Sequence, residues 1–395
     1  MLEFVPEPHS GKIAAYHLFW DAYNFSSPHS GVVQHCLQLA GEFGLLGLAP
    51  IFLTSRPVDF FKDSSFPLVS LNPSIHPVFS RVKFISASLA YQACVAQIEK
   101  QGKGGAVFFH GFSNINLPLF GTKRKIDRFI VTVHDIIPLL APQEVSRSYA
   151  WQFRFSLPMV LKKADKIVCV SDWTRSTLQE RFPSFVDKMI VIPNGYHPSE
   201  RSRLRLNLLN EEDRSLGAKH CELLSVSRWE KYKRFDDLLM ILKKNQDLYL
   251  QMVTDYSGLL YLQEKGRVFI EEKRLKIATN ISRQELLLFY KRADIYLHTS
   301  LLEGFCLPAA EALMADRPVV YRRGSALDDF VGSCGIGVPE EATTEDWLLA
   351  IEQARLLAKE ASFPQKLQER MEKQATWKSS ALNLKTIYDT MASGL

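Results

Sequence analysis

Residues 294–320 read DIYLHTSLLEGFCLPAAEALMADRPVV, in which two short apolar runs flank a pattern typical of a helix. The runs, near 295–298 and 318–321, are rich in β-branched and aromatic residues, as in strands buried on both faces of a sheet. Pro308 is favoured in the first turn of a helix, because its missing N–H would have no helical partner there. The stretch therefore predicts a strand, a helix beginning near Leu307 and a second strand of one parallel sheet.

The same alternation covers most of the chain and predicts two domains. Strand candidates in the flanking sequence are KIAAYHLF, APIFLT, AVFFH, FIVTVHD, KIVCVSD, MIVIPNG, CELLSVS and LYLQMVT. The alternation stops at about 192–216, where turn-forming and charged residues show no sustained apolar period. We expect two doubly wound, Rossmann-like α/β domains at 1–200 and 201–375 that face a cleft, with a helical segment at 376–395.

The composition excludes several classes of protein. The 395 residues are 46% hydrophobic and 23% charged, which excludes a disordered chain, a collagen and a coiled coil. The net charge of +5 is too small to predict a nucleic-acid binder. No Cys-x-x-Cys pair occurs, so we expect reduced intracellular thiols rather than disulfides or a zinc cluster. The six cysteines are Cys36, Cys94, Cys169, Cys221, Cys306 and Cys334.

The first residues, MLEFVPEPHSGK, contain no apolar segment of the kind found in secretory signals. The longest nearly apolar stretch, 43–53, is much shorter than the ~20 residues of a membrane-spanning helix. We therefore expect a cytoplasmic protein that is at most peripheral at the inner face of a membrane.

The turn before the predicted helix at Leu307 offers an anion-binding site. The backbone N–H groups of Phe305, Cys306 and Leu307 have no helical partner, and the helix dipole adds to their attraction for negative charge. Gly304 allows a ligand to approach the backbone closely. These features predict that a phosphate group binds at this turn.

Two carboxylates flank the same turn. Glu303 precedes the predicted helix, and Glu311 lies within it on the face of Leu307, four residues earlier. Carboxylates beside a phosphate site suit a nucleotide sugar, whose ribose and hexose offer hydroxyl groups. Taken alone, the two glutamates could equally be ordinary surface residues of a helix.

Candidate phosphate-binding residues follow the first strand of each domain. Arg228 and Lys233 lie in the loop SRWEKYKRF and could neutralise a diphosphate, although a basic loop is more often only solvated surface. Gly31 begins a helical pattern after the first strand of the chain, and its amide offers a second phosphate contact. His134 and Asp135 end the apolar run FIVTVHD, at the edge where open α/β sheets present their reactive groups.

Taken together, these segments resemble the retaining GT-B glycosyltransferases, specifically the glycogen-synthase-like and lipopolysaccharide mannosyl-type transferases of glycosyltransferase family 4, group 1. The markers occur in the family's order from about Lys12 to the C-terminus: the SG loop, VHDIIP, ADKIVCVSDWTRSTL, VIPNG, SRWEKYK, ADIYLHTSLLEGFCLPAAEAL and RPVV. The EGFCLPAAE block matches the family's Glu-x7-Glu motif. The resemblance implies the GT-B fold, with the segment at 376–395 crossing back to the N-terminal domain.

The resemblance also implies which residues bind the donor's diphosphate and sugar. Gly31, Arg228 and Lys233 would hold the diphosphate, and His134 would contact the transferred sugar near its anomeric carbon. The family usually has two glycines in the first of these loops, whereas Ser30 takes the place of one of them here.

Further donor contacts are implied around the Glu-x7-Glu motif. Glu303 and the amides of residues 305–307 would hold the sugar and the distal phosphate, and Glu311 would bind the ribose hydroxyls. Asn280 and Ile281 match a position that lies against the base. The Gly-rich turn that the family has after the second strand of this domain is reduced here to TDYSG.

The expected catalytic set is His134, Arg228, Lys233 and Glu303, with no cofactor and no metal ion. No Asp-x-Asp occurs in the chain, so the metal-clamp strategy of the other major transferase fold is not supported. The resemblance implies transfer of a hexosyl unit from a nucleoside-diphosphate sugar to a glycan or lipid-linked acceptor with retention of configuration. We expect GDP-mannose as donor, ahead of UDP-sugars, and a role in surface polysaccharide synthesis.

The sequence leaves two other interpretations of the function open. A non-catalytic scaffold or binding subunit could have the same fold, although the retained candidate residues argue against it. A nicotinamide-dependent oxidoreductase would need G-x-G-x-x-G directly after a strand, and the cluster GKGG precedes one instead.

The segment SYAWQFRFSLPMVLKKADK is aromatic and basic and could contact a membrane bearing a lipid-linked acceptor. We favour the alternative that Trp151, Phe153 and Phe155 pack inside the first domain or line its acceptor cleft.

Overall fold

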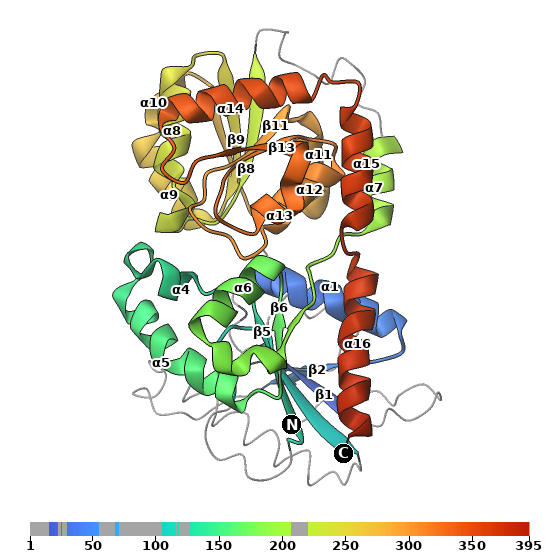
Figure 1. Cartoon of the computed structure of the whole chain (residues 1–395). Helices are drawn as coiled ribbons and strands as arrows, with labels where there is room; N and C mark the ends of the chain where they lie inside the picture. Colours follow the sequence, from blue (N-terminus) through green and yellow to red (C-terminus); the bar gives the residue numbers. More distant parts are fainter. Residues whose placement is uncertain are drawn as a thin grey trace. The chain divides into compact units, whose positions relative to one another are not determined.

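Two parallel sheets organise the chain, in the computed structural model, as two compact units (Figure 1). Unit 1 comprises residues 1–140, 147–194 and 377–395, and unit 2 comprises residues 141–146 and 195–376. The structure describes residues 16–22, 25, 30–54, 68–70, 105–115, 117, 126–206 and 220–394. Residues 207–216 of the predicted connection between domains therefore lie outside the described residues, as does Cys94. The other five cysteines are buried and form no disulfide bond.

Unit 1 contains a seven-stranded parallel sheet of order β3-β2-β1-β4-β5-β6-β7. The strands are β1 (Tyr16–Asp21), β2 (Ile51–Thr54), β3 (Leu68–Ser70), β4 (Ala106–Gly111), β5 (Arg128–Val133), β6 (Lys166–Cys169) and β7 (Met189–Val191). Its helices are α1 (Gly31–Leu45), α4 (Ile137–Leu140), α5 (Arg147–Lys163), α6 (Asp172–Arg181) and α16 (Trp377–Ser393), with a 3-10 helix, η3 (Pro183–Lys188). The strand order reverses between β1 and β4, which is the switch point of a doubly wound sheet.

Helices cover both faces of this sheet (Figure 1). On one face, Phe153 and Leu157 of α5 pack with Leu178 of α6 against apolar strand residues. On the other, α1 lies beside α16, and the Phe43 ring contacts both Trp20 of β1 and Tyr388 of α16. The continuous apolar strands thus reflect a sheet buried on both sides.

Unit 2 contains a six-stranded parallel sheet of order β10-β9-β8-β11-β12-β13. The strands are β8 (Cys221–Val226), β9 (Leu248–Thr254), β10 (Leu275–Thr279), β11 (Ile295–His298), β12 (Val319–Arg322) and β13 (Gly335–Val338). The helices are α7 (Pro198–Leu206), α8 (Phe235–Lys244), α9 (Tyr256–Lys265), α10 (Arg267–Glu271), α11 (Arg283–Arg292), α12 (Leu307–Met314), α13 (Leu327–Val331), α14 (Thr344–Leu357) and α15 (Phe363–Lys373). Three 3-10 helices, η2 (Pro142–Glu144), η5 (Lys231–Lys233) and η6 (Gly332–Cys334), complete the unit.

The core of unit 2 forms where α8 and α14 pack on the sheet. Phe235 and Leu238 of α8 lie with Trp347 of α14 among apolar residues of the strands. The helix predicted to begin near Leu307 does so, with Pro308 in its first turn. The prediction of two doubly wound parallel α/β domains is confirmed by the two sheets and their helices.

Of the three aromatic residues of α5 expected to pack inside the first domain or to line its acceptor cleft, only Phe153 packs inside. Phe153 is buried as expected, but Trp151 is 64% exposed and Phe155 is 54% exposed. The reason is helical periodicity, since Phe153 and Leu157 face the sheet while Trp151 and Phe155 lie on the outward side of α5. None of the helices among the described residues has the length and apolar character that crossing a membrane requires.

Candidate functional site

The candidate donor residues of unit 2 follow two adjacent strands, β8 and β11. The sheet order reverses between these strands, and open α/β sheets bind ligands at the carboxyl ends of the strands beside such a point. Lys233 ends η5 after β8, and Glu303 lies between β11 and α12. Two hydrogen bonds join the loops: Leu301 N–H donates to the Tyr232 carbonyl at 2.7 Å, and the Thr299 hydroxyl donates to the Lys233 carbonyl at 2.9 Å.

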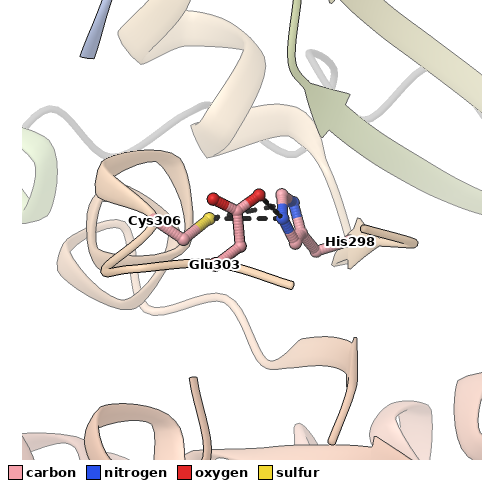
Figure 2. Close-up of side chains that lie close together, drawn as sticks. All are labelled: His298, Glu303 and Cys306. Carbon is pink, nitrogen blue, oxygen red and sulfur yellow. Dashed lines mark hydrogen bonds and ion pairs between the residues drawn. The ribbon is translucent and has the colours of Figure 1, made fainter. Parts of the chain in front are cut away.

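A buried ion pair lies at the centre of this site. Lys233 Nζ is 2.5 Å from Glu303 Oε1, and His298 Nε2 is 2.7 Å from the same oxygen. Among the described residues, no donor is paired with the second oxygen, Oε2. Figure 2 shows that oxygen directed away from His298. Oε2 therefore retains the capacity to accept a hydrogen bond from a ligand hydroxyl group.

Lys233 and Glu303 both stay ionised although they are buried, because the charge of each stabilises the ionised form of the other. Burial alone would raise the pKa of Glu303, but the Lys233 charge and the His298 hydrogen bond lower it to about 2. Burial lowers the pKa of Lys233, but the negative charge of Glu303 outweighs this and raises it above its usual value. At neutral pH the site therefore contains an ammonium group and a carboxylate group.

His298 orients the carboxylate. An ionised carboxylate only accepts hydrogen bonds, so His298 Nε2 carries a proton and donates it. The other ring nitrogen, Nδ1, lies 3.2 Å from the Tyr296 hydroxyl, which is itself 3.3 Å from the Val226 carbonyl. A chain of contacts thus runs from the end of β8 through β11 to Glu303.

The group His298, Glu303 and Cys306 has the composition of a metal site. One ligand atom of each lies within 4.8 Å of the others, and all three residues are buried (Figure 2). However, the Lys233 ammonium binds the same Glu303 oxygen that would face the ion. Two cations at one buried carboxylate repel each other, so Lys233 takes the place that a metal ion would need. Burial also raises the pKa of the Cys306 thiol well above its usual value, which disfavours the thiolate that binds metals.

The N-terminus of α12 is available to an anion, in contrast to its neighbours. Among the helices that follow β8 to β11, α9 is capped by Asp255, α11 has a capping box formed by Ser282 and Glu285, and α8 has two aspartates in its first turn. Helix α12 has neither a side-chain cap nor an acidic residue in its first turn. Among described residues, the N–H groups of 305–307 meet no acceptor. The dipole and these donors favour a bound phosphate.

Glu311 belongs to a second cluster, one turn further along α12. Its carboxylate pairs with Arg283 of α11, and Arg283 also pairs with Glu200 of α7 at 2.8 Å. The Tyr290 ring is buried nearby, and its hydroxyl lies close to the Glu311 carboxylate. Burial, followed by the Glu311 charge, raises the pKa of Tyr290 well above its usual range. Tyr290 and Glu311 therefore place a hydroxyl and a carboxylate side by side in this cluster.

The remaining candidates of unit 2 lie nearby in sequence but outside these clusters. Arg228 is exposed in the loop after β8 and forms no ion pair with any described residue. Asn280 is exposed in the turn after β10 and has a positive φ of 51°. Ile281 follows it and is half-buried. Gly304 is buried, and the Phe305 ring stacks on Phe330 at 5.1 Å.

In unit 1, Gly31 begins α1 and is exposed, and Ser30 provides no side-chain cap. A Cβ at Gly31 would meet no atom within 4 Å, so packing within the structure does not require glycine there. The first turn of α1 has no acidic residue. Its N-terminus therefore resembles that of α12.

His134 follows β5 and is held by its surroundings in one tautomer. Its Nε2 lies 2.9 Å from the Phe112 carbonyl, which only accepts, so Nε2 carries the proton. Burial lowers the pKa of His134 to about 4, and the ring is neutral at pH 7. The Nδ1 lone pair has no donor among the described residues and can accept a hydrogen bond. The His134 N–H also donates to Asn114 Oδ1 at 2.7 Å.

The structure thus brings Lys233 and Glu303 together and adds three residues that were not predicted: His298, Tyr296 and Arg283. The position of His298 at the end of a strand and five residues before Glu303 is the signal that could have singled it out. Arg283 directly follows the stretch TNIS, in which Asn280 and Ile281 are predicted to lie against the base.

Comparisons with known proteins agree with the fold. Residues 29–200 match the model of Glycosyltransferase Family 4, and residues 210–376 match that of Glycosyl transferases group 1. The chain is 24% identical over 228 residues to the O-antigen chain mannosyltransferase B of Escherichia coli. That alignment covers 55% of this chain and 59% of the relative, so the chain matches little more than half of the relative's length.

Two solved structures share the architecture over nearly the whole chain. A glycosyltransferase from Rickettsia africae is 17% identical, with a TM-score of 0.73, and covers 96% of this chain and 99% of its own. An Anabaena protein in complex with UDP-glucose is 15% identical, with a TM-score of 0.69, and covers 95% and 99%.

Proposed function

Because this chain belongs to the glycosyltransferases of the GT-B fold, we propose that it transfers a hexosyl unit from a nucleoside-diphosphate sugar to a hydroxyl group of a glycan or lipid-linked saccharide. The observation that supports this most directly is the buried Lys233–Glu303 pair beside the uncapped N-terminus of α12. A cation, a carboxylate and free N–H donors at one switch point match the phosphates and hydroxyls of such a donor.

We assign stabilisation of the departing diphosphate to Lys233, Arg228 and the first turn of α12. The bond from the anomeric carbon to the phosphate oxygen breaks, and negative charge develops on the diphosphate. Lys233 keeps its proton at neutral pH, and the N–H groups at 305–307 are already oriented, so both favour this charge without reorganising. We propose that the acceptor oxygen bonds to the same face of the anomeric carbon while its proton passes to the leaving phosphate, which retains the configuration.

The hydroxyl groups of the donor are assigned to the two carboxylates. Glu303 Oε2 accepts from the transferred sugar, and His298 and Lys233 hold the other oxygen in place. Glu311 and the Tyr290 hydroxyl bind the ribose, and Asn280 and Ile281 lie against the base. We assign to His134 of unit 1, with its neutral Nδ1, a contact with the transferred sugar near the anomeric carbon, and to Gly31 a contact with the diphosphate.

We propose that the reaction needs no metal ion, because Lys233 already supplies a positive charge at the buried carboxylate. We also propose GDP-mannose as the donor, ahead of UDP-sugars. The Escherichia coli relative is named as a mannosyltransferase, and the Anabaena structure contains UDP-glucose, so both must be tried. We place the reaction in the synthesis of a surface polysaccharide, on the cytoplasmic side of a membrane.

The proposal is tested by measuring binding and turnover separately. Thermal unfolding is followed with GDP, UDP, dTDP and ADP and with their sugars, and we expect GDP-mannose to raise the melting temperature most. Donor hydrolysis without acceptor is then measured by release of the nucleoside diphosphate, with and without a chelator. Binding with no hydrolysis and no transfer would indicate a non-catalytic subunit, and loss of turnover in chelator would refute the metal-free reaction.

A further inference from the structure

Helix α5 (Arg147–Lys163) presents an apolar stripe on its outward side. Trp151, Phe155 and Met159 are spaced four residues apart, and their exposed fractions are 64%, 54% and 44%. Residues four apart lie above one another on a helix, so the three side chains form one line along α5. The Trp151 and Phe155 rings contact each other with centroids 4.8 Å apart. The line does not belong to the core of unit 1, which α5 meets through its opposite side.

The charge around this stripe has one sign. Helix α5 contains four basic residues and no acidic one, in the sequence RSYAWQFRFSLPMVLKK. Arg147, Arg154 and Lys162 are exposed, and within the described ranges none of them forms an ion pair. The fourth, Lys163, lies over the Phe129 ring at 4.4 Å. The exposed cations thus lie at both ends and in the middle of the apolar line.

We propose that the outward face of α5 binds the surface of an anionic phospholipid membrane. Tryptophan and phenylalanine enter the region between headgroups and acyl chains, while arginine and lysine reach the phosphates. Unpaired cations with no neighbouring acid on the helix are complementary to a surface of uniform negative charge. The inference goes beyond the proposed transfer reaction and is independent of it.

The test is co-sedimentation of the full-length protein with vesicles, without sugar donor. Vesicles of phosphatidylcholine are compared with an equimolar mixture of phosphatidylcholine and phosphatidylglycerol. We expect binding to the mixed vesicles only, and weaker binding as salt is raised. Trp151→Ala/Phe155→Ala should reduce binding on the order of tenfold or more, since it removes the apolar insertion. Arg154→Gln/Lys162→Gln should reduce it by about fivefold per charge.

Matched controls come from α16 of the same unit. Leu382 is 41% exposed and Lys378 is exposed, so Leu382→Ala and Lys378→Gln remove an apolar and a charged surface group away from α5. Both controls should bind vesicles as the unchanged protein does. All four variants alter exposed side chains, and unchanged melting temperatures would show that they fold.

The proposal is overturned if mixed vesicles are not bound, or if the α5 and α16 variants bind equally. It is also overturned if the α5 variants abolish self-association measured by sedimentation velocity, because the stripe would then be covered by a second copy. Failure of vesicle binding with intact donor turnover would leave the transferase proposal standing. Vesicle binding without donor turnover would support the membrane proposal and contradict the transferase proposal.

Discussion

Unit 1 and unit 2 both contain histidines near the carboxyl ends of their strands. The groups around these histidines are neutral in unit 1 and charged in unit 2. In unit 1, burial lowers the pKa of His35 to about 3 and that of His134 to about 4. Burial also lowers the pKa of His110 well below its usual range. In unit 2, His298 lies against an ionised carboxylate that Lys233 stabilises. One edge is therefore neutral at pH 7, and the other contains paired charges.

The difference shows that burial alone decides charge only where no partner of opposite sign is present. His35 donates to Asn194 Oδ1 at 2.5 Å, and His110 contacts the Tyr388 and Thr132 hydroxyls at 2.5 and 2.8 Å, all of them neutral groups. Neutral donors and acceptors suit sugar hydroxyls, whereas a cation beside a free helix N-terminus suits phosphate. We infer that the donor phosphates bind mainly at unit 2 because its site contains the cation and the free helix N-terminus.

Removing one charge from unit 2 should have the largest effect. Lys233→Met preserves much of the side-chain volume but leaves Glu303 buried without its counter-ion, which costs about 3–5 kcal/mol of unfolding free energy. It also removes a cation from the departing diphosphate, and we expect turnover to fall by about a thousandfold. Urea unfolding and steady-state donor turnover measure the two effects.

The double variant Lys233→Met/Glu303→Gln separates stability from chemistry. With both charges gone, the site becomes neutral, as in unit 1, and stability should return to within about 1 kcal/mol of the unchanged protein. Turnover should not recover. If it does recover, Lys233 acts only by balancing Glu303 and has no contact with the diphosphate.

The fold could be predicted from the sequence to a large extent, and the exceptions have physical reasons. Continuous apolar runs identified the central strands, because these are buried on both faces. Three strands at the edges of the sheets were not predicted. Two of them, β10 (LKIAT) and β13 (GIGV), contain polar residues or glycines in place of an apolar run, since an edge strand is covered less completely. The third, β3, has three residues.

The site was predictable only as separate residues. Lys233 and Glu303 could be singled out because each follows a strand, but 70 residues separate them, and their contact depends on β8 lying beside β11. Arg283 and Glu200 are 83 residues apart and meet because α7 and α11 lie in the same unit. The spacing of residues in the sequence does not predict contacts between residues so far apart. The exposure of Trp151 likewise depends on which side of α5 meets the sheet.

As the pH falls, the free energy of unfolding of unit 1 should decrease before that of unit 2. His35 and His110 are buried and neutral in the folded protein, whereas the unfolded chain takes up their protons as the pH falls below about 6.5. Between pH 6.5 and 5, each therefore lowers the stability of unit 1 by about 2 kcal/mol. Glu303 has a lowered pKa in the folded state, so its contribution is complete above its unfolded value of 4.5 and is lost as the pH falls from 4.5 to about 2. Unit 2 should change little over the same interval.

Hydrogen exchange with mass spectrometry reads the two units separately at the two pH values. Peptides from β1, β4 and β5 should lose protection at pH 5, after correction for intrinsic rates, and peptides from β8, β9 and β11 should keep it. His35→Gln should reduce the pH dependence of unit 1, and His17→Gln, on a half-buried residue of β1, serves as control. Equal loss of exchange protection in both units would contradict the predicted difference in pH dependence.

Arg283 should affect donor affinity more than turnover. Arg283→Ala leaves Glu311 and Glu200 without their shared cation, so Glu311 no longer holds its orientation toward the ribose. Because ribose contacts are equally strong in the ground and transition states, KM for the donor should rise about tenfold with kcat nearly unchanged. Arg267→Ala, which removes an exposed ion pair on α10, should change neither constant. A fall in kcat alone would place Arg283 in the chemical step instead.

The smallest effect concerns the backbone at Cys306, where the charged site of unit 2 meets α12. Cys306 has a φ of 75° and a ψ of 75°, in the left-handed region that costs a non-glycine residue about 1–2 kcal/mol. Its Sγ also lies 3.6 Å from His298 Nε2, and this contact offsets part of the cost. Cys306→Ala removes the contact and keeps the strain, whereas Cys306→Gly removes both. The glycine variant should therefore be more stable than the alanine variant by about 1 kcal/mol in urea unfolding, with similar turnover in both. An alanine variant as stable as the glycine variant would mean that the turn preceding α12 is not strained.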